Sequence, residues 1–180
     1  MLFTPPGFSI EQAAAFSNAE IAGVRLNLAN RRERMCELMS EFPLRSPSAK
    51  VGGIYHFGRM LDKIRLHQQG RLPPDYQPNL GKGFDRSCVA FLNIDYAELV
   101  DRVNRGGSDQ EILEWCFEKG RRPSEREIYM WNEFLRKLGW NDEAASNLER
   151  RKREAGLENR SDIQTIFQFI DADEGRSSRE

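Results

Sequence analysis

The sequence predicts an all-α fold, a single compact helical domain of five to eight helices preceded by an N-terminal helical arm. Apolar residues recur at intervals of three and four through most of the chain, as they do on the buried face of a helix. No segment shows the alternation of apolar and polar residues that marks a half-buried strand. Hydrophobic residues make up 39% of the 180 residues, and 11 of them are phenylalanines, which is enough apolar material for a packed core. We place the arm at residues 1–43 and the core domain at residues 44–180.

The predicted arm begins with Ser9-x-x-Gln12, which has the form of a capping box. Apolar residues then follow at helical spacing: Ile21, Val24, Leu28, Met35, Leu38 and Phe42. A helix with this spacing packs either on its own domain or against a second copy of the chain. A homo-oligomer formed through the arm is therefore one of our hypotheses.

After two prolines and the Gly52-Gly53 pair, the spacing predicts a helix over about residues 54–69, which Gly70 can end. The next segment, residues 71–85, is rich in proline and glycine, so we expect no regular structure there. A loop of about 15 residues is long for a compact domain, and such loops often carry function.

The helices of the second half each follow a recognisable start signal. Capping boxes at Ser108-x-x-Glu111 and Ser124-x-x-Glu127 predict two of them. The aspartates expected to cap the others are Asp85, Asp95 and Asp162. We expect three tryptophans to lie in the core: Trp115, Trp131 and Trp140. The run from Glu149 to Glu154 holds four cations bracketed by carboxylates, so we expect it to form ion pairs on a solvated helix.

Composition also limits the classes of partner. The formal net charge of −1 does not favour attraction to nucleic acid or to a membrane surface, and we expect neither partner. The three cysteines lie among apolar neighbours without a CxxC pair, so we expect reduced buried thiols and no metal site. We see no signal peptide, no apolar run long enough to span a membrane and no cofactor motif. The protein is therefore expected to be cytoplasmic and to need no cofactor.

Positive charge is concentrated in one stretch. Residues 44–87 hold eight lysines and arginines against three aspartates, a formal charge of +5, whereas the segments before and after carry −1 and −5. Both histidines of the chain also lie there. We call residues 45–86 the basic island, and we expect it to bind a small anionic ligand or a protein partner.

Four side chains of the predicted helix at 54–69 share one flank, at relative positions i, i+3, i+7 and i+11: His56, Arg59, Lys63 and His67. Like charges on one flank repel each other, so carboxylates from other helices or an anionic ligand should lie nearby. Lys82, in the glycine-rich turn of residues 78–83, is expected to close over such a ligand. That turn lacks the hydroxyl residue of a GxxxxGK[ST] loop, so we interpret it as a turn and not as a nucleotide site.

Two other functions stay open. One is an enzyme that acts on a small anionic metabolite, including a phosphorylated one, with His56 or His67 as the acid or base. No nucleophile can be identified beside either histidine, and the two are not spaced as metal ligands. The other is a structural or oligomer-forming protein with residues 1–43 as its interface.

Seven blocks of the chain form a recognisable series: Arg59-Met60-Leu61-Asp62-Lys63, Gly70, Asp75-Tyr76, Phe91-Leu92-Asn93-Ile94-Asp95, Gly107-Ser108-Asp109-x-Glu111-Ile112, Ile163-Gln164-Thr165 and Asp171-Ala172-Asp173-Glu174. In order and spacing, these blocks resemble a bacterial family catalogued only as a domain of unknown function. The resemblance covers about residues 43–176, and the family pattern favours glycine where Asn93 stands. It implies a bacterial, cytoplasmic helical protein and assigns no functional residue.

Overall fold

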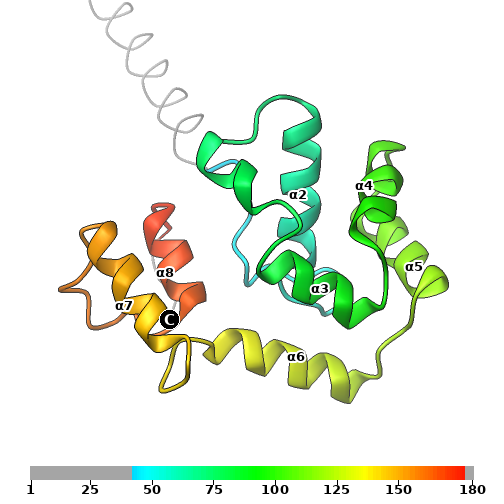
Figure 1. Ribbon diagram of the computed structural model, residues 1–180. Helices are drawn as coiled ribbons and strands as arrows, with labels where there is room; N and C mark the ends of the chain where they lie inside the picture. Colours follow the sequence, from blue (N-terminus) through cyan, green and yellow to red (C-terminus); the bar gives the residue numbers. More distant parts are fainter. Residues whose placement is uncertain (1–41, 177–180) are drawn as a thin grey trace, which may run out of the picture. The chain divides into compact units, whose positions relative to one another are not determined.

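The computed structural model describes residues 42–176, and within this range the chain is built from helices joined by short connections (Figure 1). The helices are α2 (Phe57–Gln68), the 3₁₀ helix η1 (Pro74–Asn79), α3 (Phe84–Leu92), α4 (Tyr96–Asn104), α5 (Asp109–Lys119), α6 (Glu125–Lys137), α7 (Ala145–Glu154) and α8 (Ile166–Asp173). The described range contains no strand, only one isolated bridge between Val51 and Ile54. The all-α prediction is confirmed. Of the arm predicted for residues 1–43, all but the last two residues lie outside the described range, so the arm and its boundary stay predictions.

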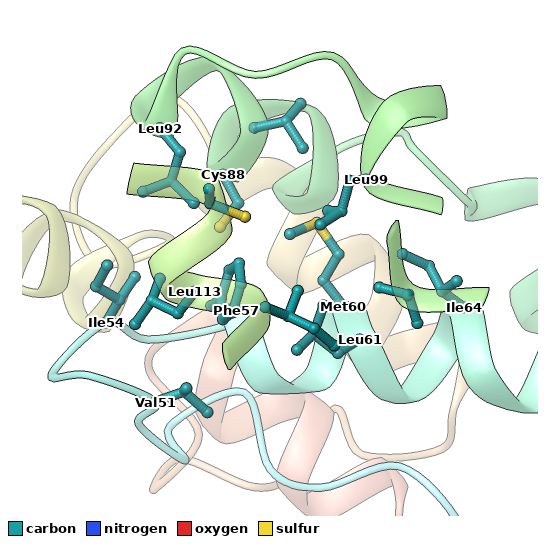
Figure 2. Close-up of a cluster of buried hydrophobic side chains, with 14 of the residues drawn as sticks. Val51, Ile54, Phe57, Met60, Leu61, Ile64, Cys88, Leu92, Leu99 and Leu113 are labelled. Atoms are coloured by element: carbon teal, nitrogen blue, oxygen red, sulfur yellow. The ribbon is translucent and has the colours of Figure 1, made fainter. Parts of the chain in front are cut away.

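The main core forms around α2, which packs against α3 and α4, while α4 packs against α5. The α2 side chains Phe57, Met60 and Leu61 have no exposed surface (Figure 2). They recur at helical spacing, so burying this one face holds α2 in place. His56, Arg59 and Lys63, on the flank that adjoins this apolar face, are buried as well.

A second apolar cluster joins α7 and α8, and α8 also packs against α6. Leu148, Ile163, Ile166 and Phe169 form its centre. The two cores meet where the ring of Phe84 contacts that of Phe167 edge to face, with 5.6 Å between ring centroids. This contact places α8 beside the N-terminal end of α3.

Most of the expected helix starts are confirmed. Asp95 caps α4, and capping boxes open α5 at Ser108 and α6 at Ser124. The prediction for the last helix was wrong, because α8 is capped by Thr165 in a reciprocal capping box with Gln168, and Asp162 pairs with Arg160 instead.

Two other expectations for local structure were wrong. The segment expected to be irregular contains the 3₁₀ helix η1, because Pro74 has the φ angle that a first helical turn needs. Trp140 is 53% exposed, whereas Trp131 is only 9% exposed and belongs to the main core. Trp140 follows the last turn of α6, beyond the apolar face that buries Trp131.

Asn93, where the family pattern favours glycine, ends α3 in the left-handed conformation with φ 56° and ψ 47°. Glycine adopts this conformation at no steric cost, and asparagine tolerates it better than most residues. The turn therefore keeps its geometry with asparagine. None of the helices in residues 42–176 is long and apolar enough to cross a membrane.

Candidate functional site

A cleft of about 670 Å³ opens beside α2. Its lining comes from α2, from the segment between η1 and the start of α3, and from α6, α7 and α8. Four of the five predicted binding residues line it: His56, Arg59, Lys63 and Lys82. His67 is exposed and does not line the cleft. These four residues therefore border one cleft, and their role in binding a ligand stays a prediction.

Asp85 does not itself line the cleft; it has no exposed surface and accepts four hydrogen bonds, three of them from the lining residues His56 and Lys63. The Lys63 ammonium donates to both carboxylate oxygens, each at 2.6 Å from Nζ. His56 Nε2 lies 2.8 Å from Oδ1, and the backbone N–H of Gly81 donates to Oδ2 at 3.2 Å. A buried carboxylate needs such partners, because leaving an ionised group unpaired away from water is very costly.

This role for Asp85 differs from the prediction. The N-cap position of α3 is occupied by Gly83, and Asp85 lies inside the first turn with its side chain directed at Lys63 and His56. The local signal, an acidic residue near a helix start, is the same for a cap and for a buried ion-pair partner. Nothing in the sequence around Asp85 separates the two.

The backbone around Asp85 brings its partners close. His56 precedes α2 with φ 67°, a left-handed conformation that is uncommon for residues other than glycine. Gly81 also has a positive φ of 67°, and a Cβ atom there would lie 2.8 Å from the ring of Tyr96. Only glycine fits this approach, which brings the Gly81 N–H to the carboxylate.

Complete burial lowers the pKa of His56 below its usual value. The hydrogen bond to Asp85 opposes this effect, but the nearby charges of Lys63 and Arg59 reinforce it. Burial by itself would raise the pKa of Asp85, yet the bond from His56 and the charge of Lys63 outweigh burial and lower it. At neutral pH the pair is thus a neutral imidazole that donates from Nε2 to a carboxylate. Its Nδ1 atom is buried and has no hydrogen-bond partner among the described residues.

Arg59 is compensated separately, by Glu174 at the end of α8. Its Nη1 donates to Glu174 Oε2 at 2.9 Å and to the carbonyl of Arg45 at 2.7 Å, and its Nη2 also donates to Glu174. The Glu174 carboxylate accepts further bonds from Tyr76 Oη and Arg176 Nη1, both at 2.5 Å. Burial and the bond to Glu174 raise the pKa of Tyr76. Arg59 is therefore held in a buried network that ties α2 to the C-terminal helix.

Other arginines of the basic island are also paired with carboxylates. Arg45 pairs with Asp62 and Asp109 at 2.6 Å each, and Arg65 pairs with Asp109 at 2.6 Å. Asp109 and Glu174 both lie outside the island in sequence. Much of the island's formal charge is thus neutralised by carboxylates that the fold brings to it.

Other cations of the cleft have no buried carboxylate. Within residues 42–176 Lys82 and Arg151 form no ion pair, and Arg150 pairs only with the exposed Glu154, at 2.6 Å. Two carboxylates, Asp75 and Asp173, share the lining. Burial raises the pKa of Asp173, and the neighbouring Glu174 acts in the same direction.

The two arginines of α7 were missed as candidates for the site. The charge pattern from 149 to 154 predicts solvated ion pairs, which Arg150 and Glu154 do form. Only the packing of α7 on α8 turns Arg150 and Arg151 toward the cleft. Arg151 also lies over the ring of Phe169, with its Cζ atom 5.1 Å from the ring centroid. A regular array of charges on an exposed helix does not reveal which of them face a neighbouring element.

Within the described part of the chain, no group of three or more histidines, cysteines or acidic residues is arranged to hold a metal ion. Cys88 and Cys116 are buried free thiols there, and Cys36 lies outside the described residues. Burial raises the pKa of both thiols, to about 12 in Cys116. They are therefore packed as small apolar groups.

Residues 41–176 match the family model described as a domain of unknown function (DUF5069). The chain belongs to this family. The match agrees with the resemblance found in the sequence, and the whole cleft lies inside the DUF5069 domain. No curated protein matches the chain.

We expect the Lys63→Met variant of this DUF5069 domain to lose about 3 to 5 kcal/mol of unfolding free energy, because it leaves the buried Asp85 carboxylate without its ammonium partner. Lys119→Met is the matched control. Its Nζ lies 3.0 Å from Glu98, but both side chains are 48% exposed, and such pairs contribute less than about 1 kcal/mol. Urea unfolding monitored by circular dichroism measures both losses. Similar losses for the two variants would show that the Asp85 pair does not anchor the fold.

We also expect the unfolding free energy to decrease between pH 7.5 and pH 5.5. Unfolded His56 takes up a proton near pH 6.5, whereas folded His56, whose pKa is lowered, takes it up only at lower pH. In this pH range the unfolded state binds more protons than the folded state. The unfolding free energy therefore decreases as the pH is lowered, by at most about 1.4 kcal/mol per pH unit for one proton. Asp85, whose pKa is below its usual value, contributes only at lower pH.

Urea unfolding at several pH values checks this prediction. The His56→Gln variant should show a shallower slope than the wild type, and His67→Gln should keep the wild-type slope because that side chain is exposed. Equal slopes for wild type and His56→Gln would contradict the assignment.

Proposed function

We propose that this domain is a binding module whose cleft receives a small anionic ligand. The observation that supports this proposal is that Lys82, Arg150 and Arg151 line one cleft and have no buried carboxylate partner within residues 42–176. Guanidinium and ammonium groups bind carboxylates and phosphates through charge-assisted hydrogen bonds. The exposed pair between Arg150 and Glu154 costs little to break, so Arg150 can turn to a ligand.

Arg59 and Lys63 have a different role in this proposal. The Arg59 guanidinium is engaged by Glu174 and the Lys63 ammonium by Asp85, so these two residues position the wall of the cleft. The carboxylates of Asp75 and Asp173 on the same lining repel a ligand that carries a large negative charge. A small anion fits this balance better than a polyanion, in agreement with the expectation of no nucleic-acid partner.

The proposal predicts that inorganic phosphate, titrated at low ionic strength, shifts backbone amide NMR signals at residues 82–87 and 147–151. The double variant Lys82→Gln/Arg151→Gln should bind at least about tenfold more weakly, because hydrogen bonds to charged groups contribute about 1.5 to 3 kcal/mol each. Arg153→Gln, an exposed residue of the same helix that does not line the cleft, is the control and should bind as the wild type does. Shifts that are scattered over the surface, or that are unchanged in the double variant, would overturn the proposal.

An enzyme is the second candidate, and the His56–Asp85 pair is the observation that favours it. His56 lines the cleft, Asp85 holds it as the Nε2–H tautomer, and Nδ1 has no partner in the described structure. Because Nδ1 is buried, this role requires a ligand that displaces part of the cleft wall to reach it. A neutral imidazole held in this way can then take a proton at Nδ1 from an acidic group of the ligand, which keeps the electron pair as an anion. The Asp85 carboxylate would then stabilise the imidazolium that forms, as the aspartate of a catalytic triad does.

The second candidate requires the hydrogen of neutral His56 to reside on Nε2. ¹⁵N NMR of the imidazole at pH 7.5 should therefore show a protonated Nε2 and an unprotonated Nδ1, and the His67→Gln variant leaves His56 as the one histidine to assign. A hydrogen on Nδ1 would remove the proposed base, whatever ligand the cleft binds.

Two alternatives remain: a protein partner that binds the basic island of residues 45–86, and a homo-oligomer formed through residues 1–43. Nothing in the structure tests the first, and all but the last two residues of the arm lie outside the described range. Both therefore stay predictions, as do a bacterial origin and a cytoplasmic location. Comparing the mass in solution of the full chain with that of a chain lacking residues 1–43 distinguishes an oligomer from a monomeric binding module.

A further inference from the structure

The lining of the cleft is apolar as well as charged. Phe134 lies on α6 and Leu138 is the residue that follows the end of this helix, while Ile166 and Ile170 lie four residues apart on α8. Residues at this spacing share one helix face, and α6 packs against α8. Together with Phe84 from α3, they give the cleft an apolar wall made from three helices.

Phe134 is the unusual member of this wall. It is 56% exposed although it lines the cleft. The other large hydrophobic side chains exposed in the described range, Tyr129, Met130 and Trp140, do not line the cleft. An exposed aromatic ring beside cations offers a stacking surface that a purely inorganic anion would not use.

We propose that the ligand is an amphipathic organic acid, with one carboxylate or phosphate group joined to an apolar ring or chain. This inference rests on the proposed function and names the class of its ligand. The anionic group meets Lys82, Arg150 and Arg151, and the apolar body covers Phe134 and Leu138. The presence of Asp75 and Asp173 on the same lining argues for a single anionic group, because a second would face a carboxylate.

The volume of the cleft agrees with this class of ligand. A cleft of about 670 Å³ lies within the range of about 300 to 1,000 Å³ that small-molecule sites occupy. Such sites combine apolar surface with polar groups that fix the orientation of the ligand, and in this cleft the polar and charged side chains are as prominent as the apolar ones. A bare phosphate or acetate would leave the apolar wall in water.

The test compares anions that share a charged group and differ in their apolar body. Isothermal titration of the full chain with inorganic phosphate and phenyl phosphate forms one arm, and acetate with benzoate forms the other. In the arm that matches the natural headgroup, the phenyl compound should bind about tenfold or more tightly, as expected for burying part of a ring against apolar surface. Comparing the two arms shows whether the headgroup is a phosphate or a carboxylate.

Variants locate the effect. The phenyl advantage is the ratio of the affinity for the phenyl compound to that for the matching simple anion. Phe134→Ala should reduce this ratio several-fold and leave the affinity for phosphate or acetate unchanged. Tyr129 is an exposed aromatic residue on the same helix outside the cleft, so Tyr129→Ala should change neither quantity. Arg151→Gln should weaken the binding of every anion tested, and Arg153→Gln should leave the affinity for each of them unchanged. Because Phe134 and Tyr129 are both largely exposed, neither variant should impair folding.

The outcomes separate the two proposals. If simple anions bind and the phenyl compounds bind no more tightly, the amphipathic ligand is excluded and anion binding stands. If the phenyl advantage is the same in Phe134→Ala, the apolar wall is not where the ring binds, and the inference is again overturned. If no anion binds in either arm, the proposed function fails together with the inference.

Discussion

The need to pair the buried carboxylate of Asp85 fixes how the elements around the cleft are arranged. A fully buried carboxylate must accept hydrogen bonds from nearby donors. Here the donors are Lys63 on α2, His56 just before α2, and the backbone N–H of Gly81 in the loop between η1 and α3. Meeting this requirement fixes α2 against the start of α3. It also orients His56 and places the loop that carries Lys82 at the edge of the cleft.

The same principle explains why a strongly basic segment is compatible with a compact fold. Arg59 is matched by Glu174, and Arg45 and Arg65 by Asp109, so the charges that are concentrated in the sequence are spread among partners in space. In residues 42–176, the cations of the cleft that have no buried carboxylate partner are a smaller set, Lys82, Arg150 and Arg151. Two of them, Arg150 and Arg151, come from a helix outside the basic island.

The cleft therefore combines a rigid, internally paired wall with more accessible cations and an apolar face. This combination is typical of sites for small organic ligands, in which buried networks hold the geometry and a few free groups recognise the ligand. All of these elements lie within the DUF5069 domain. The unpartnered Nδ1 of His56 is the feature by which the same cleft would support acid–base chemistry.

The sequence alone determined the helical class, most of the helix starts and the concentration of basic residues around α2, because apolar periodicity and capping boxes are local signals carried by residues a few positions apart. Only the tertiary structure decided which charges are neutralised. Asp85 is 22 residues from Lys63 and Glu174 is 115 residues from Arg59, and no local pattern encodes such pairings. For the same reason Arg150 and Arg151 could not be told from solvated charges, since their direction depends on how α7 packs on α8.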